Sequence, residues 1–250
     1  MKNKKEIIAS IIIIGNEILS GRTQDTNTST ISIWLNSLGI RVKEVRIIPD
    51  HEKTIIETVN KLRKKYNYIF TTGGIGPTHD DITAESISKA FNLNYGPNAE
   101  AMSILEKYYK PGDFTDGRKK MACMPDSANL ILNPTSGAPG FNVENVFCLP
   151  GVPSILKSML RGIDHMLIGG DPIISHTINL RTVESEIANS LTKVQNSNEE
   201  VDIGSYPFFR AGKLGVALVI RSSEQNKIDK CVVEILKFVK QKNIKVIENN

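Results

Sequence analysis

The amino-terminal part of the chain alternates between apolar runs and amphipathic segments, and this alternation restricts the fold more than any other feature of the sequence. The isoleucine-rich run Ile7–Ile14 is typical of a strand that is buried on both faces of a parallel sheet. Apolar spacing predicts helices over residues 27–39 and 52–65, and strands over 40–50 and 66–72. The order strand, helix, strand, helix, strand predicts an α/β domain with a parallel sheet and right-handed crossovers.

The carboxyl ends of these strands are expected to form a ligand site, because ligands bind at that edge of a parallel sheet. Glu17 follows the first predicted strand, Asp50 follows the second, and the segment TTGGIGPTHDDIT, residues 71–83, follows the third. Acidic groups that are distant in sequence should therefore converge at this edge. Each acid also has an ordinary alternative role, and Asp50 could simply cap the helix that follows it.

Residues 73–81, which we call the glycine loop, have the composition of an anion site. Gly73, Gly74 and Gly76 can adopt positive φ, so that successive backbone N–H groups point into one concavity and attract phosphate. Thr83 is predicted to cap the following helix, whose amino terminus adds further N–H donors. The segment matches neither the P-loop nor the dinucleotide-binding fingerprint. The alternative is a tight strand-to-helix turn with solvated acids.

Two adjacent carboxylates, Asp80 and Asp81, close the glycine loop. A carboxylate about 4 Å from a phosphate repels it by roughly 4 kcal/mol at an effective dielectric constant near 20, so an anion site here needs compensation. A divalent cation supplies it, since Mg²⁺ takes one or two protein carboxylates together with substrate phosphates. Neighbouring residues on an extended segment point in opposite directions, so we predict that Asp81 faces the metal while Asp80 caps the next helix.

The segment after the glycine loop is less regular. Residues 96–109 read as a helix, whereas residues 110–130 are rich in turn formers and are expected to form a mobile segment over the site. Residues 147–160 predict a strand, a tight Pro-Gly-Val-Pro turn and a helix that opens at Ser154. The amino terminus of this helix is either a second place where an anion could bind or only a rigid connection between the strand and the helix.

Composition excludes several classes of function. The 250 residues have the apolar and charged fractions of a soluble globular chain, and the net charge of +4 is scattered with few aromatics, so no nucleic-acid surface is expected. The three cysteines are far apart, which favours free thiols and a cytoplasmic location. The basic, apolar amino terminus is interrupted by Glu6 and lacks a cleavage site, so we expect neither a signal peptide nor a membrane partner. The four histidines show no zinc-ligand spacing.

The pattern changes at the Gly-Gly-Asp-Pro segment, residues 169–172. Beyond it, residues 173–250 predict strand, helix, strand, helix and strand, including a last strand over 244–248, and so form a second, smaller α/β domain. The first domain is predicted to comprise residues 1–168.

Five motifs together resemble the molybdopterin-binding fold, in its competence/damage-inducible CinA-like branch. They are GNEILSGRTQDTN, PDHEKTI, TTGGIGPTHDDIT, SGAPGF and LPGVPS, in this order, and the resemblance covers residues 7–168. The resemblance implies a three-layer α/β/α domain whose glycine loop holds phosphate and whose catalytic carboxylates are Asp81 and Asp50. The second domain is similar to the middle domain of CinA-like proteins, whose carboxyl-terminal amidase-like domain is not expected in this chain.

The residue-level expectations follow from these motifs. The predicted catalytic residues are Asp81, Asp50 and Asp80, and Asp81 and Asp50 are predicted to hold the metal. The predicted substrate-binding residues are Gly73, Gly74, Gly76, Pro77, Thr78, Glu17, Asn27, Ser136, Gly137, Pro150, Gly151 and Ser154.

The leading functional hypothesis is metal-dependent hydrolysis of a nucleotide pyrophosphate of the ADP-ribose or FAD class. The metal would be Mg²⁺, Mn²⁺ or Co²⁺, and a water that it activates would attack one phosphorus. The alternatives are a molybdopterin-binding or adenylyl-transferring protein of molybdenum cofactor biosynthesis, and a non-catalytic nucleotide-binding module. Ile75 and His79 stand where the cofactor-biosynthesis enzymes usually have threonine and arginine, which favours the hydrolase over the first alternative. The resemblance also implies a homodimer that acts on a small-molecule nucleotide.

Overall fold

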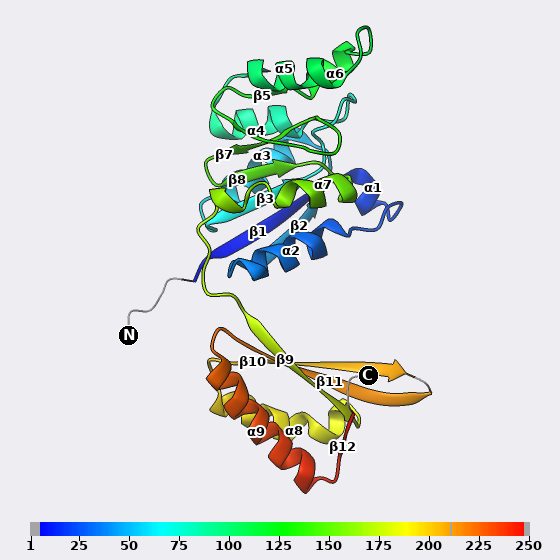
Figure 1. Cartoon of the computed structure of the whole chain (residues 1–250), viewed down its shortest axis with the longest axis vertical. Helices are drawn as coiled ribbons and strands as arrows, with labels where there is room; N and C mark the ends of the chain where they lie inside the picture. Colours follow the sequence, from blue (N-terminus) through cyan, green and yellow to red (C-terminus); the bar gives the residue numbers. More distant parts are fainter. Residues whose placement is uncertain (1–5, 211, 248–250) are drawn as a thin grey trace. The chain divides into compact units, whose positions relative to one another are not determined.

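The computed structural model describes residues 6–210 and 212–247 (Figure 1). The chain divides into two compact units, Met1–Gly170 and Asp171–Asn250. None of the helices in the described part of the chain is both long and apolar enough to cross a membrane.

The first unit is built on a six-stranded sheet with the strand order β2-β1-β3-β8-β7-β6. The first four of these strands are parallel, as the sequence predicts, and β7 and β6 continue the sheet in antiparallel pairing. The strands are β1 (Ile8–Ile14), β2 (Arg41–Ile48), β3 (Tyr68–Thr72), β6 (Asn129–Ile131), β7 (Gly140–Val143) and β8 (Val146–Leu149).

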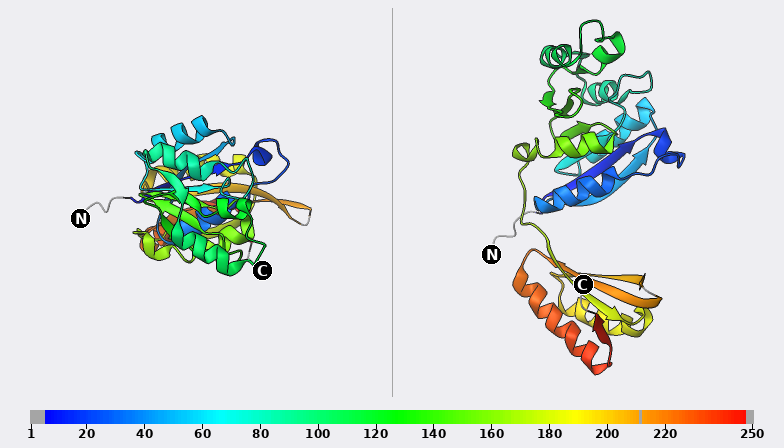
Figure 2. Two further views of the ribbon diagram at one scale, coloured as in Figure 1. Left: turned by 90° about the horizontal axis from the view of Figure 1, so that it is seen from above. Right: turned by 45° about the vertical axis from the view of Figure 1, so that its right-hand side comes forward.

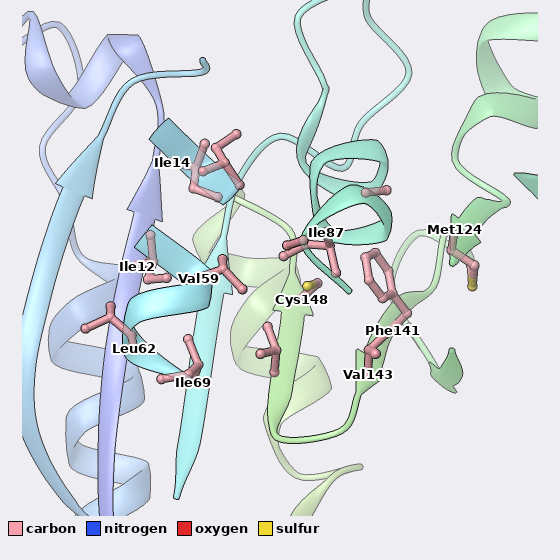
Figure 3. Packing of buried hydrophobic residues seen from close by; sticks show 14 of the residues in the cluster. Ile12, Ile14, Val59, Leu62, Ile69, Ile87, Met124, Phe141, Val143 and Cys148 are labelled. Carbon is pink, nitrogen blue, oxygen red and sulfur yellow. The ribbon is translucent and has the colours of Figure 1, made fainter. Parts of the chain in front are cut away.

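Helices cover both faces of this sheet, which confirms the predicted three-layer arrangement. Side chains of β1 alternate between the two layers: Ile12 and Ile14 pack with one pair of helices, and Ile11 and Ile13 pack with the other pair. Figure 3 shows the first of these cores, in which Val59 and Ile87 meet the sheet. That layer contains α3 (Glu52–Leu62) and α4 (Thr83–Phe91), and the opposite layer contains α2 (Asn27–Ser37) and α7 (Pro153–Leu160).

The predicted turn-rich stretch 110–130 carries regular structure. It contains the short helix α6 (Asp116–Lys120) and the strand β5 (Cys123–Pro125), which pairs with β4 (Tyr95–Pro97). Helix α5 (Ala99–Tyr108) precedes it, and its amino terminus is capped by the Asn98 side chain, which accepts from the Ala101 N–H at 3.0 Å. These elements form a small subdomain beside α4 (Figure 1).

The second unit is a four-stranded antiparallel sheet with the order β10-β11-β9-β12, and two helices share one core with it (Figure 2). Strand β10 was missed by the sequence prediction because Gly204 and Pro207 interrupt it. It lies at an edge of the sheet, where proline is tolerated. The predicted last strand includes Glu248, which lies outside the described residues. The elements are β9 (Ile174–Arg181), α8 (Glu184–Ser197), β10 (Asp202–Arg210), β11 (Lys213–Ser222), α9 (Gln225–Gln241) and β12 (Lys245–Ile247).

Candidate functional site

The ends of β1 and β2 are tied together by backbone and carboxylate contacts. The Gly15 N–H donates to the Ile48 carbonyl at 3.1 Å, and Oδ2 of Asp50 accepts from the Asn16 N–H at 2.8 Å. Asp50 therefore does not cap α3, which begins after His51 without a side-chain cap. The short helix α1 (Asn16–Leu19) starts here, and the carboxylate of its Glu17 folds back over the backbone of Gly15.

The glycine loop crosses the end of β1 at very close range. Gly73 has φ of +104° and Gly74 has φ of +67°, so both occupy the region that favours glycine. A Cβ on Gly73 would lie 2.1 Å from the Ile14 carbonyl oxygen, and one on Gly74 would lie 2.2 Å from Oγ1 of Thr83. Glycine is therefore required at both positions by conformation and by space.

Thr83 anchors the glycine loop instead of capping the helix. Helix α4 begins at Thr83 itself, with no side-chain cap, and the buried Thr83 hydroxyl donates to the Gly73 carbonyl at 2.9 Å. The Thr83 N–H donates to the Gly74 carbonyl, also at 2.9 Å. The cap prediction was wrong because the chain enters the helix one residue earlier than the sequence suggested. With the loop carbonyls turned towards α4, the N–H groups of Gly74, Ile75 and Gly76 donate to no group in the described part of the chain.

The two aspartates have different surroundings. Oδ2 of Asp81 accepts from the Thr78 N–H at 2.8 Å and from the Thr78 hydroxyl, so that this carboxylate closes the turn. Asp80 does not cap α4, contrary to the prediction, because the helix starts after Ile82 and the Asp80 side chain is turned to solvent. The pKa of Asp80 is lowered, first by the neighbouring Thr78 hydroxyl and the loop backbone and also by the charge of Lys120.

Asn27 connects the carboxyl ends of β3 and β8. Its side chain is 5% exposed, and its Nδ2 donates to Oγ1 of Thr72 at 2.9 Å and to the Gly151 carbonyl at 2.8 Å. Its Oδ1 is buried and has no hydrogen-bond partner within the described structure. The Asn27 N–H donates to Oδ1 of Asp25 at 2.9 Å, so Asp25 holds the start of α2. Asp25 was missed, although its position just before a helix is a common cap signal.

The remaining predicted residues lie on neighbouring loops. Ser136 accepts from the Asn133 side chain at 2.7 Å within its own loop, and Gly137 packs against the ring of Tyr108, the last residue of α5. Pro150 precedes Gly151 in the turn after β8, and the exposed Ser154 is the second residue of α7, which begins at Pro153. In the residues described, no hydrogen bond joins Ser136, Gly137, Pro150 or Ser154 to the glycine loop.

A shallow hollow, open to solvent, lies beside the glycine loop. Gly76 and Asp81 line it together with Lys120 from α6, which sequence reasoning missed because it lies far along the chain. Burial raises the pKa of Tyr95 to about 12 and raises the pKa of the Cys123 thiol, and both side chains also line the hollow. Neither group is therefore suited to proton transfer near neutral pH. Over the described ranges, no three His, Cys, Asp or Glu side chains lie close enough together to hold a metal ion.

Comparison with known proteins identifies the first unit. Residues 10–168 match the family model described as probable molybdopterin binding domain. The chain belongs to the molybdopterin-binding family. Its CinA-like character is also shown: the CinA structure of unknown function from Thermoplasma acidophilum is 32% identical, with a TM-score of 0.59, over 64% of this chain and 98% of that one.

Relatives of this chain extend over both units. A protein from Archaeoglobus fulgidus is 33% identical over 233 residues, which is 93% of this chain and 98% of the relative. A protein from Thermoplasma volcanium is 34% identical over 205 residues, or 80% of each chain. Residues 172–248 match the model described as FAD synthase, middle domain. The chain thus combines a domain of the molybdopterin-binding family with a second, smaller domain that is similar to the middle domain of FAD synthase.

Proposed function

We propose that the first unit binds the pyrophosphate of a nucleotide of the FAD or ADP-ribose class at the glycine loop. The observation that carries this proposal is the run of N–H groups at Gly74, Ile75 and Gly76, which donate to no other group in the described structure. Consecutive amides that project from a glycine-rich turn at the start of a helix are typical of phosphate sites. The likeness of residues 172–248 to a domain of FAD synthase supports a flavin or other adenine dinucleotide as the ligand.

Asn27 supports a ligand that carries a hydrogen-bond donor. Its amide nitrogen is fixed by the Gly151 carbonyl, so its buried Oδ1 is the atom left without a partner in the residues described. A buried acceptor of this kind is costly unless it is satisfied. A ribose hydroxyl of the bound nucleotide would satisfy it if Asn27 shifts on binding so that Oδ1 becomes accessible.

We further propose that the site hydrolyses the bound pyrophosphate with the help of a divalent cation. Asp81 and Asp50 each use Oδ2 to hold the backbone, and Oδ1 of each accepts no hydrogen bond from the described part of the chain. These oxygens suit Mg²⁺, Mn²⁺ or Co²⁺ shared with substrate phosphates, the arrangement in which one or two protein carboxylates suffice. A cation held by these oxygens would supply charge neutralisation and an activated water.

The chain's own groups have separate tasks in this reaction. The amides of the glycine loop hold the non-bridging phosphate oxygens, where negative charge increases during the reaction. Water adds to one phosphorus, the bridging P–O bond breaks, and two phosphate monoesters leave. From ADP-ribose these are AMP and ribose 5-phosphate, and from FAD they are AMP and FMN.

A second candidate is a molybdopterin-binding or adenylyl-transferring role, and the match of residues 10–168 favours it specifically. A third is nucleotide binding without turnover, which the structural use of Asp81 in the Thr78 turn favours. In both cases the glycine loop would hold phosphate as proposed above.

One experiment separates these candidates. The full chain is incubated with FAD or ADP-ribose in the presence of Mg²⁺, Mn²⁺, Co²⁺ or a chelator, products are separated by chromatography, and binding is measured by calorimetry. AMP release only with metal supports the hydrolase, whereas binding without turnover supports the non-catalytic module. In a parallel incubation with ATP and molybdopterin, formation of an adenylylated pterin would support the biosynthetic role. Absence of binding to any of these nucleotides would refute the phosphate site.

A further inference from the structure

Helix α6 lies directly over the glycine loop, although about forty residues of chain separate the two. Nζ of Lys120 donates to the Thr78 carbonyl, and a Cβ on Gly117 would lie only 3.4 Å from the Pro77 carbonyl oxygen. The contact places a positive charge next to the loop turn that Asp81 closes.

Lys120 differs from the other cations on α6. Lys119 is exposed and pairs with Asp116 at 2.9 Å, and the Arg118 guanidinium stacks over the Tyr109 ring at 4.1 Å. Lys120 is half-buried and lines the hollow together with Gly76 and Asp81. Of the three basic residues in the last turn of this helix, only Lys120 is directed at the glycine loop.

A pyrophosphate at this loop needs a cation from the protein as well as backbone amides. Asp80 and Asp81 carry negative charge within the loop itself, and each would repel a bound phosphate. An ammonium group has three N–H donors, and the Thr78 carbonyl occupies one of them, so others remain for a ligand. Lysine commonly binds phosphate as a point charge.

We propose that Lys120 is a phosphate-binding residue of this site, and that its ammonium contacts a pyrophosphate oxygen while it stays bound to the Thr78 carbonyl. The proposal rests on the function proposed above and adds a residue from α6 to it. Lys120 also holds α6 against the loop, so it couples the position of this helix to the presence of the anion.

The test compares Lys120→Gln with Lys119→Gln, which removes the same charge from the adjacent residue of the same helix. Dissociation constants for ADP-ribose and inorganic pyrophosphate are measured by calorimetry in chelator, at two salt concentrations. Loss of a charge-assisted hydrogen bond of typical strength should weaken binding about 10- to 100-fold in Lys120→Gln, with a smaller salt dependence. Lys119→Gln should bind within about twofold of wild type, since an exposed ion pair contributes little.

The possible outcomes are distinct. Partial recovery of affinity in Lys120→Arg would show that the positive charge matters and not only the packing of α6. Equal affinities for the Lys120→Gln and Lys119→Gln proteins would overturn the assignment of Lys120 while leaving the phosphate site intact. Failure of the wild-type protein to bind either probe, both in chelator and with Mg²⁺ present, would overturn the proposed function, and this assignment with it. Circular dichroism of each variant shows whether it is folded.

Discussion

Replacement of Gly74 by alanine tests whether the glycine loop has the conformation described. Gly21 provides a matched control, because its φ of +72° is close to the +67° of Gly74 and no atom lies within 4 Å of a Cβ added there. Gly21→Ala should lose only the conformational advantage of glycine in the left-handed region, about 1 kcal/mol of unfolding free energy.

The added methyl group at Gly74 has a further effect. It would lie 2.2 Å from Oγ1 of Thr83, a fully buried side chain, so Thr83 must move and its hydrogen bond to the Gly73 carbonyl must break. An unsatisfied buried carbonyl costs about 1–3 kcal/mol, so Gly74→Ala should lose about 3 kcal/mol in total. In a Thr83→Ala background the clash with the hydroxyl is gone, and the same glycine substitution should cost about 1 kcal/mol.

Urea denaturation followed by tryptophan fluorescence measures these changes. Trp34 is the single tryptophan, and it packs against Phe70 in the first unit with ring centroids 5.5 Å apart, so its signal reports the unfolding of that unit. Equal losses for Gly74→Ala and Gly21→Ala, or equal costs in the two Thr83 backgrounds, would refute the proposed packing of the loop against α4.

Three further predictions concern charge and domain structure. Asp81→Asn should keep the Thr78 turn but lower metal-dependent turnover by about 100-fold or more, whereas Asp80→Asn should retain most activity; wild-type rates for Asp81→Asn would exclude its proposed role. The pKa of Glu44 is lowered to about 2, first by a hydrogen bond from Tyr66. The ionised carboxylate therefore stabilises the folded chain fully above pH 4.5, and this contribution is lost as the pH falls through 2. Glu44→Gln should therefore cost about 1 kcal/mol at neutral pH and show a shallower acid transition, and parallel wild-type and variant curves in urea titrations between pH 2 and 6 would contradict this. A chain that ends at Gly170 should fold and bind ADP-ribose as the full chain does; a folded but non-binding product in calorimetry would mean that the second unit contributes to the site.

The buried half of the first sheet could be predicted from the sequence because its strands are apolar on both faces. The apolar run from Ile8 to Ile14 predicts a strand in the centre of the sheet, and β1 does lie between β2 and β3. The antiparallel addition of β7 and β6 was not predicted, since these strands are short and carry no distinct period. Strand β10 was missed for a different reason. Proline is tolerated mainly in edge strands, and the sequence does not show that the segment around Pro207 lies at the edge of its sheet.

Local rules were less successful at the candidate site. Thr83 and Asp80 were assigned as caps from their types and spacing, but capping depends on where the chain turns into the helix. Thr83 is the first residue of α4 and Asp80 lies two residues before its N-cap, Ile82, so neither of them caps it. The tie between Asp50 and the Asn16 N–H joins two strand ends and has no local signature. Lys120 reaches the glycine loop through folding of a distant segment, so only the structure could bring it into consideration.

The two carboxylates beside the glycine loop have separable roles in the structure. Asp81 accepts from both the N–H and the hydroxyl of Thr78, whereas the amides of Gly74, Ile75 and Gly76 have no acceptor in the described part of the chain. The carboxylate thus shapes the proposed anion site through the turn that it closes, and it does not need a metal to do so. Its charge nevertheless stays within the loop together with that of Asp80, and the single ammonium of Lys120 cannot balance both. A bound pyrophosphate would add further negative charge, so the electrostatics of this edge favour a ligand that arrives with a divalent cation over one that arrives alone.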